Sequence, residues 1–561
     1  MLFSPVTERS PRVRTLYILL YIFLLAGSMT ILAPFVIMLS GSFETSPRFS
    51  DGTLFPRFLI DDTALWRRYL EAKYQGSGNS LQAAWGDEKV ELETVTLPDT
   101  TADTDLWQDF LRETQPPIEL FALGFTRGNQ RIPSYNDRQF RQWLTGRYGD
   151  TRQIASALGI QEIPINRISS PQIGVLGAPL RRSAFVDAFY EFQASRPLDQ
   201  KWAWDIGGYY RMVFLPMFIG GGVADFNARY GTTYQSYAEV PFGRTVPAVA
   251  AEAWAEFVKR LLRPDFVTLS PEGTARLASL GIDRSEFIRT AAAPGELMID
   301  SLDVRFATWA AERGVADARI PQLALDFEAF QKEKNFWRWQ FPWLNFATVF
   351  DQILLHGHAL RNTCILVVLS ILGALTVNPL AAYALSRFKM KKTYHILLFF
   401  LATLAFPAEV TMIPVFLQLR EFGMLNSYAA LIVPGLANGF SIFLLKGFFD
   451  SLPRELYEAA EIDGASELRM FWQFTMALST PILAVIALGA FAGAYGAFFF
   501  ALLLAPDPDM WTVMVYIYQL RQNVDQPVVY ASLLITAVPT LLVFVFCQNI
   551  IMRGIIVPSE K

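Results

Sequence analysis

Long stretches without a single charged residue constrain this chain more than any other feature of its sequence. Four of them exceed the roughly 20 residues that an α-helix needs to cross about 30 Å of hydrocarbon. A fifth apolar stretch carries one acid, Glu409, and a sixth is shorter. The six stretches are Leu16–Ser40, Thr363–Ser386, Ile396–Gln418, Ser427–Leu445, Thr475–Pro506 and Gln526–Met552. The sequence therefore predicts an all-α polytopic membrane protein with six transmembrane helices.

Basic residues near the ends of these stretches indicate the orientation of the chain. Loops on the cytoplasmic side are enriched in Lys and Arg. With six spans, Arg9, Arg12, Arg14, the turn 387–392 and Arg553 all fall on one side. We therefore expect a multi-pass protein of the cell inner (plasma) membrane with both termini in the cytoplasm. The first stretch is too long for a signal peptide, so we expect a retained anchor.

The chain divides into three predicted parts. Residues 1–47 hold the cytoplasmic N-terminus and the first span, and residues 346–561 hold the other five spans. Between them, residues 48–345 are rich in charge, Trp and Pro, and contain no stretch able to span a membrane. By the topology above this soluble insert is extracytoplasmic, and its size suits one large or two small domains.

A short sequence pattern that recurs along the insert predicts internal repeats. An aromatic residue, a Phe three positions later and a terminating Pro recur in residues 107–116, 189–197 and 254–264. Phe110 and Phe192 are 82 residues apart, and so are Arg147 and Arg229 of two Arg-Tyr-Gly motifs. Because the Phe pair and the Arg pair have the same spacing, the sequence favours a duplicated module within the insert. We expect a mainly α-helical insert with short extended connections and repeats at about 98–178, 179–246 and 247–345.

The aromatic residues of the insert allow two interpretations. At helical spacing they form one face of a helix and usually pack into a core, whereas exposed rings could stack on sugars. Acids are so numerous that no pair stands out as catalytic. His356 and His358 are two residues apart and His395 is isolated, so no metal-ligand cluster is evident. We expect no catalytic residue, no metal site and no nucleic-acid partner.

A polar segment, residues 450–478, separates two of the apolar stretches. Pro453 suits the first turn of a helix, and Glu455 and Glu458 lie near the positive end of that helix. Gly464 permits the positive φ at which the chain can turn, and Ser466 can cap a second helix. These residues alone fit either a helix–turn–helix surface for a partner or an ordinary structural loop.

This segment resembles the EAA loop of ATP-binding-cassette (ABC) importer permeases, whose pattern is Glu-Ala-Ala, three residues, Gly, and an apolar run ending near Leu-Pro. The likeness extends from Asn362 to the C-terminus and includes the first span. The chain is most similar to the maltose-transporter type of carbohydrate permease, in particular its smaller six-span subunit. Such a subunit has no counterpart to the large insert.

The resemblance implies a type I ABC importer permease fold and ATP-driven alternating access. It also implies a second permease subunit, an ABC ATPase dimer and an extracytoplasmic substrate-binding protein as partners within the lipid bilayer. The chain lacks the Gly-x4-Gly-Lys phosphate loop, so ATP and Mg would be bound by the ATPase and no cofactor by this chain. The residues that would couple to the ATPase are Glu455, Glu458, Ala459, Ala460, Asp463, Gly464 and Ala465.

Two positions depart from the family pattern. The Leu-Pro after the loop reads Met476-Ala477, so the loop exit lacks the usual helix stop, and Gly496-Ala497 replaces a polar patch. Polar residues within membrane spans are candidates for the translocation path, although each can equally bond neighbouring helices. The path candidates are Glu409, Asn438, Ser441 and Tyr495.

The sequence therefore favours a permease subunit of an ATP-driven importer for sugars or oligosaccharides rather than an enzyme. Two alternatives stay open. The insert could be a built-in extracytoplasmic receptor for the ligand, or the chain could be a non-transport membrane sensor that uses a permease scaffold.

Overall fold

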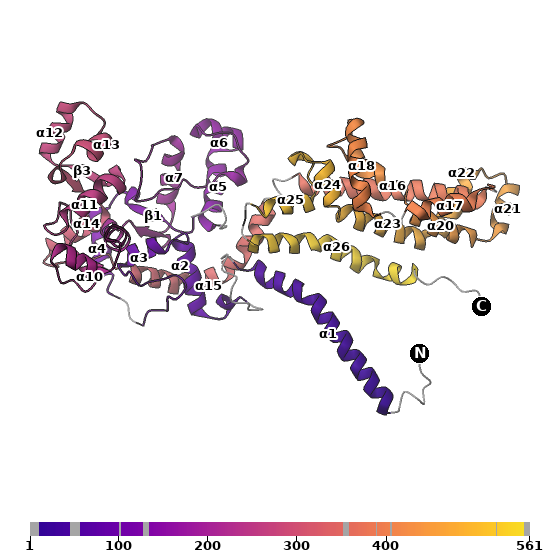
Figure 1. Ribbon diagram of the computed structural model, residues 1–561, viewed down its shortest axis with the longest axis horizontal. Coiled ribbons are helices and arrows are strands. Elements are labelled where there is room, and N and C mark those ends of the chain that lie inside the picture. The colour runs from indigo at the N-terminus through magenta and orange to yellow at the C-terminus, as the bar shows by residue number, and fades with distance from the viewer. Residues whose placement is uncertain are drawn as a thin grey trace. The chain divides into compact units, whose positions relative to one another are not determined.

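The chain folds into two compact units in the computed structural model shown in Figure 1. The structure describes residues 11–44, 56–99, 102–126, 134–351, 358–388, 390–403, 407–522, 524 and 526–554. The membrane unit comprises Met1–Ser42 and Phe346–Lys561, and the insert comprises Phe43–Asn345. The predicted start of the insert at residue 48 lies outside the described residues, so that boundary stays a prediction.

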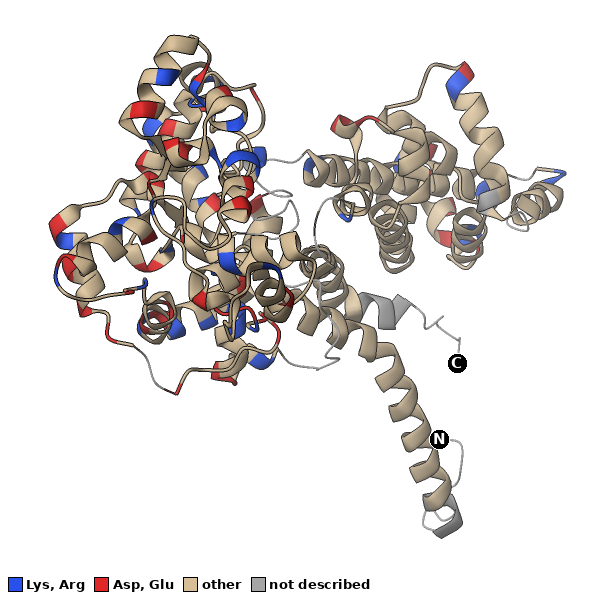
Figure 2. Ribbon diagram, turned by 60° about the vertical axis from the view of Figure 1, so that its left-hand side comes forward, with Lys and Arg blue, Asp and Glu red and all other residues tan. Residues whose placement is uncertain are grey.

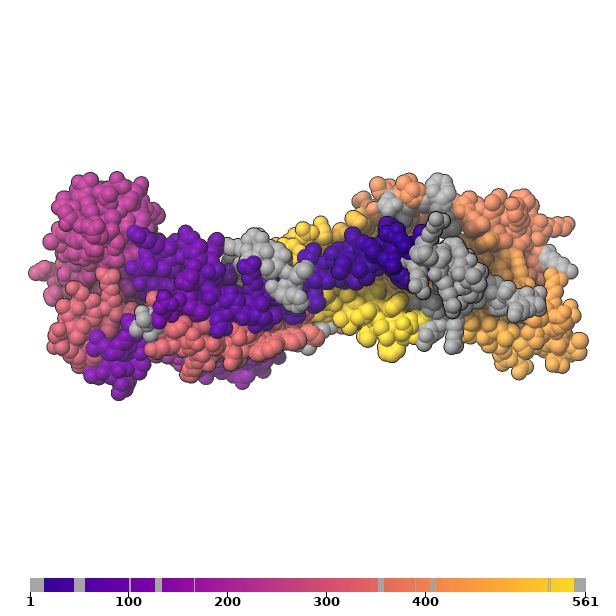
Figure 3. Space-filling model, turned by 90° about the horizontal axis from the view of Figure 1, so that it is seen from below, coloured from indigo at the N-terminus to yellow at the C-terminus, as the bar shows by residue number. Residues whose placement is uncertain are grey.

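Three helices in the described part of the membrane unit are long and apolar enough to cross a membrane unaided. Figure 2 shows that the helix leading from the end marked N is drawn without Lys, Arg, Asp or Glu over its described length, whereas such residues are spread over the insert. Helix α1 lies beside α26, as Figure 3 shows. The three helices are α1 (Pro11–Ser42), α16 (Ala359–Arg387) and α26 (Gln526–Gly554).

The remaining apolar stretches are broken rather than straight. Two helix pairs bend by 51° and 85° at a short break, and counting each pair as one span gives up to five spans among the described residues. The stretch 396–418 divides into α17 and α18 around residues 404–406, which lie outside the described residues, so six spans stay a prediction. The elements are α17 (Thr393–Thr403), α18 (Ala408–Glu421), α19 (Tyr428–Ile432), α20 (Gly439–Asp450), α23 (Thr480–Tyr495), α24 (Phe499–Leu504) and α25 (Val513–Leu520).

The exit of the polar segment 450–478 corrects one expectation. The replacement of Leu-Pro by Met476-Ala477 predicted a missing helix stop, yet the chain bends by 85° between Glu467–Met476 and α23. The stop comes a few residues later, because Pro481 occupies the first turn of α23. A proline there has no N–H to donate to a preceding turn, so the helix begins afresh.

The insert is mainly helical, as predicted, with two small antiparallel sheets of two strands each. Strand β1 (Phe121–Leu123) pairs with β2 (Lys201–Ala203), and β3 (Val267–Leu269) pairs with β4 (Leu297–Ile299). Its longer helices are α2 (Asp62–Lys73), α3 (Gly78–Trp85), α4 (Asp105–Thr114), α5 (Tyr135–Tyr148), α6 (Thr151–Leu158), α7 (Ala184–Ser195), α10 (Val223–Tyr230), α12 (Pro271–Leu280), α14 (Leu302–Ala311) and α15 (Gln322–Val349). Its shortest helices are α8 (Ile206–Gly208), α9 (Leu215–Ile219), α11 (Ala251–Glu256) and α13 (Arg284–Glu286).

The echoed motif corresponds to a recurring element: a helix, a proline, a short 3₁₀ turn and a three-residue strand. Among the described residues it occurs four times, ending in β1, β2, β3 and β4, and each sheet joins two copies. The fourth copy escaped the sequence comparison because Arg284 stands where Trp254 begins the third, although Phe287 and Pro294 match Phe257 and Pro264. The repeat boundaries near residues 178 and 246 stay predictions.

The aromatic residues of this motif are buried, which favours the core interpretation over exposed sugar stacking. Trp107, Phe110, Phe192, Trp254 and Phe257 are all at most 2% exposed. Elsewhere in the insert, rings also pack directly against one another, for example where Phe125 stacks on Trp337 with centroids 4.1 Å apart. Burial of such side chains supplies most of the free energy that holds a helical insert together.

A buried carboxylate pair makes the stability of the insert sensitive to pH. Asp303 accepts hydrogen bonds from the backbone N–H groups of Ile206 and Gly207, at 3.3 and 2.9 Å, and Asp205 accepts one from Gly208 at 2.6 Å. Burial, reinforced by the Asp303 charge, raises the pKa of Asp205 to about 7. In the folded chain this group therefore keeps a proton that the unfolded chain releases.

We expect the insert to lose stability as the pH rises from about 4 to about 7. The folded state binds more protons than the unfolded state in this range. The free energy of unfolding therefore falls by up to a few kcal/mol as the pH rises, and then levels off. Thermal unfolding followed by tryptophan fluorescence reports mainly on the insert, since only Trp472 and Trp511 lie outside it. Asp205→Asn should flatten the pH dependence, and parallel curves for both proteins would refute the assignment.

Candidate functional site: the polar loop of the membrane unit

The polar segment forms two short helices joined by a tight turn. Helix α21 (Arg454–Ile462) follows Pro453, and α22 (Glu467–Arg469) continues into a π-helical turn, Met470–Met476. Ser466 caps α22 by accepting a hydrogen bond from the Arg469 N–H at 3.4 Å. The structure therefore has the helix–turn–helix that the sequence predicts.

Gly464 makes the turn between the two helices. Its φ is 76°, a left-handed value that strains any residue with a Cβ. The Gly464 N–H donates to the Glu461 carbonyl at 3.0 Å, and the Ala465 N–H donates to the Ala460 carbonyl at 2.9 Å. These bonds satisfy carbonyls at the end of α21, as in other glycine-ended helices. A Cβ added at Gly464 would meet no atom within 4 Å, so the turn faces open space.

One face of the loop is anchored to the membrane helices. Tyr457 is 5% exposed, and its hydroxyl shares a 2.8 Å hydrogen bond with the Thr475 hydroxyl. The Arg387 guanidinium, at the end of α16, lies over the Tyr457 ring. Tyr383, one turn earlier on α16, donates a 2.7 Å hydrogen bond to the Glu467 carboxylate. Any displacement of the loop therefore acts directly on α16.

The opposite face is open. Most of the predicted coupling residues are exposed there: Glu455, Glu458, Ala459, Asp463 and Gly464. Ala465 is half-buried, and Ala460 is 5% exposed and packs into the core beneath the loop. The two adjacent alanines of α21 therefore differ in exposure. Ala459 is available to a partner, whereas Ala460 is not.

Large apolar side chains also lie exposed on the loop, a signal that sequence reasoning missed. Ile462 is 86% exposed, Leu468 is 64% exposed and Trp472 is 49% exposed. Exposed apolar side chains of this size are typical of a contact with another protein or with a membrane. Together with the acids and Gly464 they form what we call the outer face: Glu455, Glu458, Ala459, Ile462, Asp463, Gly464, Leu468 and Trp472.

Three of the four path candidates, Asn438, Ser441 and Tyr495, form hydrogen bonds within the membrane unit, and their assignment to the path stays a prediction. Asn438 caps α20 by accepting the Ser441 N–H at 2.9 Å, and its own N–H donates to the Asn378 side chain at 2.8 Å. The Tyr495 hydroxyl donates to the Thr536 carbonyl at 2.6 Å. That carbonyl lies three residues before Pro539, where a helix loses hydrogen bonds.

The fourth path candidate, Glu409, belongs to the first turn of α18, but its side chain lies outside the described residues. Its assignment to the path stays a prediction.

A second polar cluster, at the other end of α16, was not foreseen. The buried Asn362 side chain donates to the carbonyls of Asp509 and Trp511 at 2.7 and 3.1 Å. It accepts the Tyr428 hydroxyl at 2.9 Å. Thr363 accepts the Val513 N–H at 2.9 Å. This cluster ties the loop before α25 to the start of α16, and it joins residues too far apart in the chain for local patterns to reveal.

In the described residues, no three His, Cys, Asp or Glu side chains lie close enough together to hold a metal ion. The loop has exposed acids and apolar side chains on one face and a rigid seat on the other. Chemically this arrangement suits docking of a protein and transmission of its movement.

Comparisons with known proteins point to one family. Residues 377–556, which include the loop, match the family described as "Binding-protein-dependent transport system inner membrane component". The diacetylchitobiose uptake system permease protein NgcG of Streptomyces coelicolor is 32% identical over 217 residues, covering 38% of this chain and 71% of that protein. The sn-glycerol-3-phosphate transport system permease protein UgpE of Yersinia enterocolitica is 32% identical over 211 residues, covering 36% of this chain and 74% of that protein.

Among solved structures, a bacterial ABC transporter involved in the import of the acidic polysaccharide alginate is similar to this chain. It aligns with a TM-score of 0.34 and 25% identity, covering 36% of this chain and 78% of that chain.

Proposed function

Because the chain belongs to the family of binding-protein-dependent transport system inner membrane components, it is a permease subunit of an ATP-driven importer, and we propose that its substrate is a sugar or oligosaccharide. The membrane unit would supply half of the translocation path, and a second permease subunit the other half. The substrate class rests on the relatives: NgcG is named for a disaccharide and UgpE for a polyol phosphate.

The loop is the point at which we propose that ATP hydrolysis acts on the chain. The observation that carries this assignment is the division of the loop into an open outer face and a seat on α16. An ATPase subunit that grips the outer face would move α16 through Tyr383–Glu467 and Arg387–Tyr457. ATP and Mg would be bound by that ATPase dimer, and this chain would bind neither.

The orientation and the other partners complete the proposal. We place the loop and both termini in the cytoplasm and the insert outside, where a substrate-binding protein would deliver its ligand. The insert would then stand where the incoming ligand arrives.

Purification and reconstitution test this function. A tagged full-length chain, extracted from its own membrane, should retain a second permease subunit and an ATPase. In proteoliposomes supplied with the cognate binding protein, ATP hydrolysis should rise several-fold with N,N′-diacetylchitobiose or another oligosaccharide, and the labelled sugar should accumulate inside. Absence of a co-purifying ATPase would overturn the proposal, and so would hydrolysis that no sugar stimulates.

A further inference from the structure

The insert contains a cavity of about 210 Å³ between the turn that precedes β2 and helix α15. Its inner wall includes Lys73, Trp202 and Gln322, and its rim includes Asp199, Glu328 and Lys332. A dry cavity of about 150 Å³ is enough to hold benzene. The cavity therefore has room for a single six-membered ring with its substituents.

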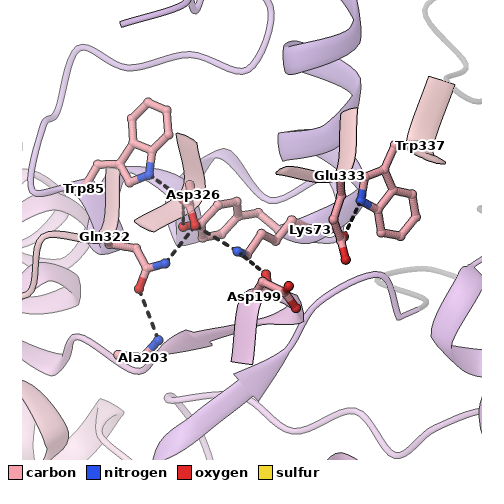
Figure 4. Close-up of polar contacts among 9 residues, drawn as sticks. Lys73, Trp85, Asp199, Ala203, Gln322, Asp326, Glu333 and Trp337 are labelled. Atoms are coloured by element: carbon pink, nitrogen blue, oxygen red, sulfur yellow. Dashed lines mark hydrogen bonds and ion pairs between the residues drawn. The ribbon is translucent and has the colours of Figure 1, made fainter. Parts of the chain in front are cut away.

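The polar groups of the inner wall are held in fixed positions (Figure 4). The Lys73 ammonium lies 3.0 Å from Asp326 and donates to the Asp199 carbonyl at 2.7 Å. Gln322 donates to Asp326 at 2.8 Å and accepts the Ala203 N–H at 3.4 Å. A ligand that enters would meet groups already ordered, which lowers the entropy lost on binding.

One hydrogen-bond acceptor in the cavity is buried and unsatisfied. The Oδ1 atom of Asp199 has no hydrogen-bond partner among the described residues, and its other carboxylate oxygen lies 3.8 Å from the Lys332 ammonium. Buried carboxylate oxygens are normally bonded, so each exception calls for an explanation. The Asp199 side chain as a whole is 17% exposed, so a ligand hydroxyl would donate to its other oxygen, Oδ2, rather than to the buried Oδ1.

The charges around the cavity balance. The charged lining residues are Lys73, Lys201, Lys332, Asp199 and Glu328. Lys73 is already paired with Asp326, which does not line the cavity, so the others contribute two charges of each sign and leave no surplus for an anion or a cation. Burial also lowers the pKa of Lys201 to about 8. This balance favours a neutral ligand that both donates and accepts hydrogen bonds.

A sugar ring has this chemistry. Each hydroxyl donates one hydrogen bond and accepts others, and the C–H faces of the ring pack on aromatic side chains. Here Trp202 and Trp107 line the cavity beside the carboxylates and lysines. We propose that the cavity binds one neutral sugar ring of the transported substrate, with the Asp199 carboxylate accepting a hydroxyl. This rests on the proposed sugar-importer function and makes the insert a receptor within the permease.

Titration of the full-length chain in lipid nanodiscs tests the proposal. The probes are glucose, N-acetylglucosamine, N,N′-diacetylchitobiose and sn-glycerol-3-phosphate, and tryptophan fluorescence is the readout. At least one neutral sugar should give a saturable change, and Asp199→Asn should weaken its binding by 10-fold or more. The matched control, Asp187→Asn, alters an aspartate 53% exposed on α7 and should bind as the parent does.

The variants need an independent check of folding. Thermal unfolding of Asp199→Asn should match that of the parent, and if it does not, Lys332→Ala at the exposed rim should weaken binding without unfolding the chain. The proposal is overturned if no neutral sugar saturates the parent, if only sn-glycerol-3-phosphate binds, or if a folded variant binds unchanged. Sugar-stimulated ATP hydrolysis in the complex, measured separately, distinguishes loss of this site from loss of the importer function.

Discussion

Replacing Glu458 with lysine should release the ATPase subunits from the purified complex and abolish ATP-dependent uptake. Glu458 lies exposed on the outer face of α21, so the substitution leaves the fold of the loop intact. In a docked complex it would replace an attraction by a like-charge contact, which costs several kcal/mol. Such a change lowers affinity by at least about 100-fold. Affinity purification followed by gel quantification of the ATPase measures the loss directly.

A charge-matched variant separates a docking effect from a general effect of charge. Glu421→Lys alters an exposed glutamate at the end of α18, outside the loop, and should keep its full complement of ATPase. Gly464→Trp provides a second test, because its side chain would project from the open turn into a partner and would also strain the left-handed turn itself. If both Glu458→Lys and Gly464→Trp keep the ATPase and its stimulated hydrolysis, the loop is not the coupling site.

The helix–turn–helix of the polar loop was predictable because its signals are local. Pro453, Gly464 and Ser466 mark helix ends by their own backbone chemistry, and the structure places each where that chemistry requires. The seat beneath the loop was not predictable, since Tyr383 and Arg387 approach from more than 60 residues away. For the same reason, the burial of Ala460 could not be distinguished from the exposure of Ala459 before the partner helices were known.

The membrane spans show what composition can and cannot predict. An uncharged run indicates where a chain can enter a bilayer, and the three unbroken long helices follow such runs closely. The amino-acid composition of a run does not reveal that a single proline, which lacks a backbone N–H, can break the helix. The run Thr475–Pro506 therefore looked continuous, although Pro481 restarts the helix and a second break precedes α24.

The helical character of the insert and its repeated motif could be predicted from the sequence, but the contacts that join distant copies could not. Pairing of β1 with β2 connects residues about 80 positions apart, and the repeat offset did not indicate that the two copies would pair. The polar network around Asp326 joins α2, α3 and α15 across more than 240 residues, and no pattern in the sequence marks it. Long-range polar contacts of this kind are specified only by the assembled core.

Replacing Asp326 with alanine should destabilise the insert by about 3–5 kcal/mol, the range for breaking a buried ion pair by removing one partner. Asp326 is fully buried and accepts from Lys73, from Tyr74 at 2.6 Å, from Trp85 at 2.8 Å and from Gln322 (Figure 4). Without it, the Lys73 charge stays buried at 1% exposure and the other donors lose their acceptor. Denaturant unfolding followed by tryptophan fluorescence measures the change.

Two further variants test whether the unpaired Lys73 ammonium causes the destabilisation of Asp326→Ala. Asp109→Ala removes an acid from an exposed pair with Arg112, 52% and 75% exposed, and should cost less than about 1 kcal/mol. The double variant Lys73→Met with Asp326→Ala removes both charges and leaves the same missing volume at position 326 as the single variant, so it should be more stable than Asp326→Ala alone. Equal stability of the single and double variants would mean that lost packing, rather than an unpaired ammonium, accounts for the destabilisation.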